Sequence, residues 1–224
     1  MSGPLTIAID GPVASGKTVV GKLLAERLGC RFLDTGIMYR AVTWAAIQQG
    51  TELDDDAALT RLAESVDIRL VLAEGGDRLT LNGQDITDHL RYPEVERGVS
   101  PVSTVSGVRS ALVAQQRAIA EEGSIVMVGR DIGTVVLPDA RVKVFLKASP
   151  EVRARRRLLE LKEKGQTAEY SQVVDGLMRR DKIDSERADS PLRPAEDAIE
   201  LVTDRMDIDE VVQKVAAMVE ENRC

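Results

Sequence analysis

Residues 11–18 read Gly-Pro-Val-Ala-Ser-Gly-Lys-Thr and match the pattern G-x-x-x-x-G-K-[ST] at every fixed position. The apolar residues 5–9 stand before the motif, and apolar residues at helical spacing follow it: Val19, Val20, Leu23, Leu24 and Leu28. A strand, a glycine-containing loop and a helix, in this order, are the context in which the pattern binds phosphate. At average residue usage, the four fixed positions match by chance in roughly one such chain in a hundred. The motif therefore predicts a phosphate-binding loop rather than a turn that happens to spell it.

The residue types in the loop have physical reasons. Glycine lets the backbone bend so that successive N–H groups point at phosphate oxygens, and the helix N-terminus adds about half a positive charge. Lys17 is expected to reach the β- and γ-phosphates as a point charge, and Thr18 to place its hydroxyl on Mg²⁺. The predicted ATP-binding residues are Gly11, Pro12, Val13, Ala14, Ser15, Gly16, Lys17 and Thr18.

Composition excludes several classes of protein. The chain has 224 residues, enough for one large domain with a substantial core, and aromatic residues make up only 3%, so that core is aliphatic. The net charge of −7 gives no general affinity for nucleic acid or anionic membranes. Cys30 and Cys224 lack metal-ligand spacing, and no apolar run approaches the length of a membrane helix or a signal peptide. We expect a reduced, cytoplasmic, monomeric protein with no nucleic acid or membrane partner.

Strands and helices are predicted to alternate along most of the chain. Apolar runs predict strands at 5–10, 31–33, 124–128, 141–147 and 198–202. Helical patterns lie at 17–28, 36–49, 57–65, 93–104, 106–122, 150–164, 171–187 and 207–221. This alternation is typical of a parallel sheet covered by helices on both faces, so the predicted fold class is α/β.

A small antiparallel insert is predicted to interrupt this alternation. Residues 67–72 and 78–81 alternate apolar and polar with period two, and residues 74–77 form the turn between them. Asn82-Gly83 is a strong hairpin signal. The insert, at about 66–90, is expected to act locally rather than to extend the main sheet.

Two groups of arginines lie at helical spacing in the last third of the chain. Arg153, Arg156 and Arg157 share one helix face, whereas Arg155 points elsewhere. They are interpreted either as a lid that closes over phosphates and excludes water, or as a solvated basic face. Arg180, Asp184 and Arg187 share a face of the next helix. Asp184 either holds the two guanidiniums and accepts from sugar hydroxyls, or belongs to an ordinary salt-bridge ladder.

A third polar group is Asp34-Thr35-Gly36-Ile37-Met38-Tyr39-Arg40, at the end of the second predicted strand. It is expected at the same sheet edge as the phosphate loop, although it could be no more than a helix cap with a surface arginine. Thr35 is the expected N-cap. His89 is interpreted as a surface or insert residue without a chemical role, and Trp44 as a core residue.

The order of these motifs resembles that of the bacterial cytidylate kinase family, a family of P-loop nucleoside monophosphate kinases. The resemblance covers nearly the whole chain and includes a specific run: Gly129-Arg130-Asp131-x-Gly133-Thr134-Val135-Val136-x-Pro138-Asp139-Ala140. It implies a single P-loop kinase domain over 1–224, with a parallel sheet of P-loop NTPase type. Residues 35–103 would form the region that binds the nucleoside monophosphate, and residues 150–170 a helical lid.

The resemblance also implies an activity in pyrimidine nucleotide metabolism: transfer of the γ-phosphoryl of ATP to CMP or dCMP, with Mg²⁺, giving CDP or dCDP and ADP. Lys17, Arg153 and Arg157 would serve catalysis. Ser100, Arg109 and Asp131 would contact cytosine, since a carboxylate accepts from its exocyclic amine. Thr35 and Tyr39 would line the acceptor site. The acceptor phosphate would be bound by Arg40, Arg130 and Arg187, and the ribose by Arg180 and Asp184.

Two features depart from the usual pattern. Ser15 stands where many relatives have a second glycine, and no Walker B aspartate is obvious. Mg²⁺ would then rest on Thr18, the phosphates and water, with help from a nearby carboxylate left open. Two rival functions remain open: another small-molecule kinase on this fold, and a nucleotide switch that makes no product. The N-K-x-D signature of GTP switches is absent from the sequence.

Overall fold

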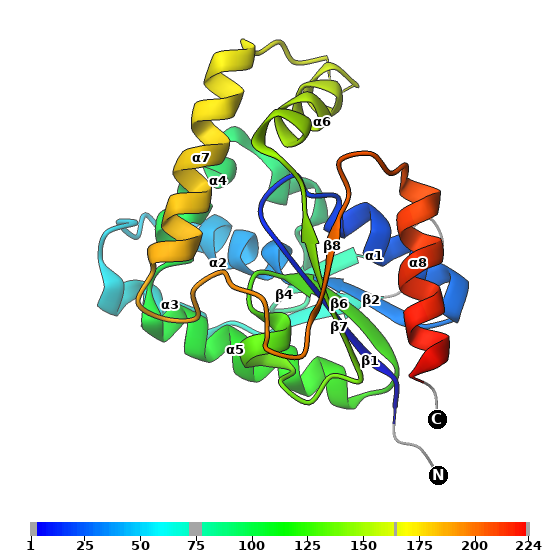
Figure 1. Cartoon of the computed structure of the whole chain (residues 1–224). Helices are drawn as coiled ribbons and strands as arrows, with labels where there is room; N and C mark the ends of the chain where they lie inside the picture. The colour runs from blue at the N-terminus through cyan, green and yellow to red at the C-terminus, as the bar shows by residue number, and fades with distance from the viewer. Residues whose placement is uncertain (1–3, 72–77, 164, 223–224) are drawn as a thin grey trace. The chain divides into compact units, whose positions relative to one another are not determined.

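The structure is a computed structural model that describes residues 4–71, 78–163 and 165–222 (Figure 1). The predicted turn at 74–77 and Cys224 lie outside these residues. The chain forms two compact units, which we describe one at a time: residues 1–32 with 122–224, and residues 33–121.

The first unit is built on a parallel sheet. Within the described residues, its strand order is β2 (Arg31–Asp34), β6 (Ile125–Gly129), β1 (Thr6–Asp10), β7 (Val142–Lys147) and β8 (Ile199–Val202). Parallel ladders join β1 to β6 and β7, and β7 to β8. Asp10 is level with Gly129 and Phe145, so three strands end at the same edge. The predicted α/β class is confirmed, and ligands in such folds bind at this edge.

Two helices pack on one face of this sheet. The helices are α1 (Lys17–Leu28) and α8 (Ile208–Glu221), which lie next to each other (Figure 1). Their apolar side chains share an aliphatic core with those of β1, β6 and β7. Helix α1 has the predicted bounds because Gly29 ends it at a φ of +64°. Helix α8 begins at a capping box in which Asp207 and Glu210 bond each other's backbone N–H groups.

The rest of the first unit consists of η2 (Ile132–Val136), a single π-helical turn, and the neighbouring helices α6 (Pro150–Glu163) and α7 (Tyr170–Glu186) (Figure 1). Helices α6 and α7 bury Ala154, Val173 and Leu177 between them. The turn η2 was not predicted, because one turn carries no periodic pattern.

The second unit packs four helices with a small antiparallel sheet. The helices are α2 (Gly36–Gln48), α3 (Asp56–Ser65), α4 (Pro93–Val102) and α5 (Ser106–Glu121), and a short 3₁₀ turn, η1, spans Thr87–Arg91. The sheet contains β3 (Ile68–Val71), β4 (Arg78–Leu81) and β5 (Gln84–Asp85). The predicted antiparallel insert is confirmed, and Asn82-Gly83 forms the hairpin turn with φ values of +51° and +82°.

Two local expectations, for Thr35 and Trp44, are corrected in this unit. Thr35 occupies the N-cap position of α2, but the side chain that accepts there is Asp34, whose Oδ1 takes the Gly36 N–H at 3.0 Å. His89 lies in the predicted insert and is half-buried, and its ring stacks on Trp44 with centroids 5.4 Å apart. Trp44 itself is only half-buried. Among the described helices, none is long and apolar enough to cross a membrane.

Candidate active site

The phosphate loop has the backbone that its glycines allow. Gly11 has a φ of +148°, and a Cβ there would lie 2.3 Å from the Leu146 carbonyl oxygen. Gly16 has a φ of +97° directly before α1. Lys17 is buried, and its Nζ donates to the Pro12 carbonyl at 2.6 Å. The lysine is thus held against the loop, next to the helix N-terminus that favours anions.

Two arginines of α6 hold the loop by its carbonyl groups. Arg153 Nη1 donates to Val13 O at 3.2 Å, and Arg156 Nη1 donates to Ser15 O at 3.3 Å. Arg156 also donates to both oxygens of Thr203, in the segment after β8. This face of α6 therefore contacts the phosphate loop and is not simply solvated.

The arginines of α6 differ in their surroundings. Arg153 is 3% exposed, and its Nη2 also lies 2.6 Å from Asp181 Oδ2 on α7. Arg157 is half-buried and pairs with Glu160 at 2.7 Å, whereas Arg155 is exposed. The sequence predicted that Arg153, Arg156 and Arg157 share one face of the helix and that Arg155 points elsewhere, and the burial of these side chains agrees.

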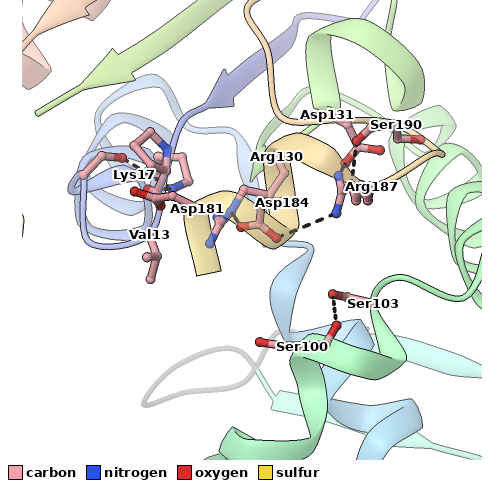
Figure 2. A network of polar contacts seen from close by, with 12 residues as sticks. Val13, Lys17, Ser100, Ser103, Arg130, Asp131, Asp181, Asp184, Arg187 and Ser190 are labelled. Atoms are coloured by element: carbon pink, nitrogen blue, oxygen red, sulfur yellow. Dashed lines mark hydrogen bonds and ion pairs between the residues drawn. The ribbon is translucent and has the colours of Figure 1, made fainter. Parts of the chain in front are cut away.

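A second cluster joins the segment after β6 to the end of α7. Arg130 Nε donates to Asp184 Oδ2 at 2.7 Å. Arg187 lies between two carboxylates, with Nη1 at 4.0 Å from Asp184 Oδ1 and Nη2 at 3.6 Å from Asp131 Oδ1 (Figure 2). Arg187 Nε also donates to the Ser190 carbonyl at 2.7 Å. The end of α7 is thus tied to Arg130 and Asp131 by charge-assisted contacts.

Electrostatics keep this cluster charged. Burial alone raises the pKa of Asp184, but the guanidiniums of Arg130, Arg187 and Arg180 outweigh it and hold that pKa below its ordinary value. Three arginines against two carboxylates, Asp131 included, leave a net charge of +1. The cluster is therefore suited to an additional anion such as a phosphate group.

The second unit groups the other predicted residues. Arg109 is 3% exposed; its guanidinium carbon lies 5.5 Å from the centroid of the Tyr39 ring, and its Nη1 donates to Ser103 O. Ser103 Oγ donates in turn to the Ser100 carbonyl at 2.8 Å (Figure 2). Arg40 Nη1 pairs with Glu96 Oε1 at 2.7 Å. Tyr39 is buried as well, and the guanidinium over its ring is a cation–π contact that joins α2 to α5.

The predicted residues therefore fall into two sets, one in each unit. The first unit holds the phosphate loop with Arg130, Asp131, Arg153, Arg157, Arg180, Asp184 and Arg187. The second unit holds Thr35, which is buried, with Tyr39, Arg40, Ser100 and Arg109.

The sequence did not single out two carboxylates that the structure ties to these residues. Asp181 is the partner of Arg153, and Asp10 accepts the N–H groups of Ile132 and Gly133. Burial raises the pKa of Asp10 to about 6, against the lowering by these N–H bonds. The only signal for Asp10 was its position directly before Gly11.

The described residues contain no group of three or more His, Cys, Asp or Glu side chains that could hold a metal ion. Thr18 lies exposed in the first turn of α1. A single hydroxyl ligand fits Mg²⁺, which commonly keeps several waters and binds substrate phosphates.

Comparison with known proteins gives a consistent result. Residues 7–221 match the family model described as "Cytidylate kinase". The chain is 48% identical over 221 residues to a cytidylate kinase of Bacillus velezensis, with 99% of both chains covered. It is 45% identical over the same length to a cytidylate kinase of Bacillus subtilis, again with 99% of both chains covered. A solved structure of an uncharacterized protein from Eubacterium ventriosum shares the fold, with a TM-score of 0.54, 16% identity, and 97% and 99% of the two chains covered.

Proposed function

Because the chain belongs to the cytidylate kinase family, we propose that it transfers the γ-phosphoryl group of ATP to CMP or dCMP, giving ADP and CDP or dCDP. The observation that carries the acceptor side is the cluster of Arg130, Arg187 and Asp184 with Asp131 (Figure 2). It lies in the same unit as the phosphate loop, and with Arg180, the third arginine that acts on Asp184, it has a net charge of +1. A kinase for anionic acceptors needs such a second phosphate-binding group, whereas a nucleotide switch does not.

The phosphate loop and α6 would bind the donor. The backbone N–H groups of the loop, which all residues of 11–18 except Pro12 possess, would surround the phosphates, and Lys17 would exchange its bond to the Pro12 carbonyl for phosphate oxygens. Phosphoryl transfer requires alignment and positive charge rather than covalent help, and Arg153 and Arg157 supply further cations from α6. The loop stays fixed meanwhile, because Arg153 and Arg156 hold its carbonyl groups.

The acceptor phosphate would bind Arg40, Arg130 and Arg187. Its oxygens would then accept hydrogen bonds from guanidiniums that now form ion pairs with carboxylates. Arg180 and Asp184 would bind the ribose, and Asp184 stays ionised there because its pKa is lowered. The acceptor is already an anion at neutral pH, so no general base is required.

The base would be read by Ser100, Arg109 and Asp131, with Thr35 and Tyr39 lining the site. A carboxylate accepts from the exocyclic amine of cytosine, and an arginine donates to the ring N3 and O2. Uracil has a carbonyl in place of that amine, so a fixed carboxylate disfavours UMP. Mismatched buried polar groups of this kind discriminate strongly between substrates.

Mg²⁺ is the proposed cofactor, held by Thr18 together with phosphate oxygens and water, and it would neutralise charge on the transferring group. We propose further that residues 35–103 are the acceptor-binding region and residues 150–170 a lid within one kinase domain. The protein would act as a cytoplasmic monomer without a nucleic acid or membrane partner.

The test is a coupled assay for ADP with ATP and Mg²⁺ and one acceptor at a time: CMP, dCMP, UMP, AMP, GMP, dTMP or shikimate. We expect strong preference for CMP and dCMP, and loss of turnover when Mg²⁺ is chelated. Activity with another acceptor alone would overturn the proposed base contacts. Binding of ATP without acceptor-dependent turnover would favour the switch instead.

A further inference from the structure

We propose that Asp10 is a positioning residue of the acceptor site: its carboxylate fixes the segment 130–133, and through it the side chains of Arg130 and Asp131. The inference rests on the proposed function, because it takes Arg130 and Asp131 as acceptor-binding residues.

The geometry joins two segments that are far apart in the sequence. Asp10 is the last residue of β1 and is 4% exposed. Its Oδ1 accepts the Ile132 N–H at 2.8 Å, and its Oδ2 accepts the Gly133 N–H at 2.7 Å. These N–H groups open the turn η2, where the first donors of a helical turn find no partner inside it. Asp10, which directly precedes the phosphate loop, therefore holds the backbone of the segment that follows Arg130 and Asp131.

The held segment carries the chemistry. Arg130 and Asp131 directly precede Ile132, and they contact Asp184 and Arg187 of the acceptor cluster. A shift of the backbone at 132–133 therefore moves two side chains that are proposed to bind the acceptor. Misplacement by about 1 Å is enough to cost a site much of its efficiency.

A carboxylate is the group that this position requires. It offers two acceptor oxygens and no donor, whereas an asparagine would turn an NH₂ group toward one of the two N–H donors. A Cβ at Gly133 would lie at an ordinary contact distance of 3.4 Å from Asp10 Oδ2, and its tighter contact, 3.2 Å, would be with Lys143 Cδ. The burial that raises the pKa of Asp10 shows that the charge is costly here. A residue kept for packing alone would be apolar.

Loss of the carboxylate should affect the two substrates unequally. The phosphate loop keeps other supports: the β1 ladders to Gly129 and Phe145, and the bonds from Arg153 and Arg156 to its carbonyl groups. Without the Asp10 carboxylate, the segment 130–133 loses the two hydrogen bonds that the Ile132 and Gly133 N–H groups donate to it. The acceptor site should therefore loosen more than the donor site.

The experiment compares Asp10→Asn with the wild type by steady-state kinetics and by calorimetric binding of CMP. We expect KM for CMP to rise at least about tenfold and KM for ATP to change less than about twofold, with CMP binding weakened in parallel. Glu122→Gln is the matched control. It removes a carboxylate bonded to Arg31 in the same unit, just before the start of β6 and so at the sheet edge opposite Asp10, and should leave both KM values unchanged.

The outcomes separate this inference from the proposed function. A wild type that does not phosphorylate CMP would refute both. With an active wild type, equal rises in both KM values, or a lower Tm with unchanged KM values, would show a merely structural role. A raised Mg²⁺ requirement with unchanged KM for CMP would place Asp10 at the metal and also overturn the inference. If Asp10→Asn does not fold, Gly133→Ala adds a Cβ 3.2 Å from Lys143 Cδ; this shifts the same segment and should raise KM for CMP alone.

Discussion

Arg153 on α6 and Asp181 on α7 form an ion pair of 2.6 Å in which the arginine side chain is only 4% exposed and the aspartate 20%. The same guanidinium donates to Val13 O in the phosphate loop and to Ala148 O before α6. One side chain thus joins the two helices to the loop. Its hydrogen bonds to carbonyl groups do not neutralise its charge, so Asp181 supplies the compensating negative charge.

We predict that Asp181→Asn destabilises the protein by about 3 kcal/mol, because it leaves a buried guanidinium without its counter-charge. Chemical denaturation measures this as a lower free energy of unfolding. Glu186→Gln on the same helix is the control: its pair with Lys182 spans 4.0 Å between exposed side chains and should contribute less than about 0.5 kcal/mol. Equal losses in the two variants would contradict the assignment.

The sequence predicted the main elements because their signals are local. Helix α1 has the predicted bounds, since the phosphate loop begins it and Gly29 ends it. The parallel strands and the antiparallel hairpin follow from apolar runs and from Asn82-Gly83. The turns η1 and η2 were missed, because a single turn has no period to detect.

Motifs and spacing predicted which residues belong to the site, but not the contacts that these residues make. Spacing placed Arg153, Arg156 and Arg157 on one face, but it could not show that this face contacts the phosphate loop. The role of Asp10 was hidden for a different reason. Its partners are backbone N–H groups 122 and 123 positions away, which any residue type except proline provides.

Lys17 is predicted to be required for turnover rather than for folding. Lys17→Ala removes a cation at the transferring phosphoryl and should lower kcat by at least about 100-fold. Lys22→Ala is the control, since Lys22 is exposed on the same helix. The coupled ADP assay measures turnover, and thermal unfolding checks that the fold persists. Near-normal turnover of Lys17→Ala would refute the assignment of the phosphate loop.

Asp131 is predicted to determine the acceptor. Asp131→Ala removes the proposed partner of the cytosine amine and should raise KM for CMP at least about tenfold, with a much smaller change for ATP. The preference for CMP over UMP should fall in parallel. Asp139→Ala, at an exposed position in the same segment, should change neither. Equal effects on the KM values of CMP and ATP would exclude Asp131 from the acceptor site.

The arginines of α6 provide a comparison within one helix. Arg157→Ala should lower kcat by about tenfold or more, because it removes a cation from the face that carries Arg153 and Arg156. Arg155→Ala removes the same charge from the exposed face and should have little effect. Single-turnover measurements distinguish the chemical step from product release. The reverse order of effects would count against the lid proposal.

The last prediction concerns stability and pH at Asp10. Burial raises its pKa from 3.8 to about 6, Asp131 adds to the rise, and the two N–H bonds and Lys17 oppose it. A pKa that is higher in the folded state means that the folded state binds the proton more tightly. The stability from this group is therefore present below about pH 3.8 and lost as the pH rises through about 6.

Asp10→Asn cannot titrate, so it isolates this contribution from that of the other carboxylates. We expect the free energy of unfolding of the wild type, minus that of the variant, to fall by about 3 kcal/mol as the pH rises from about 3.5 to about 7. Urea unfolding of both proteins at matched pH values measures the difference, because titrations common to both cancel. A difference that stays constant across this range would show that Asp10 titrates near its ordinary pKa, and that its burial costs less than the structure implies.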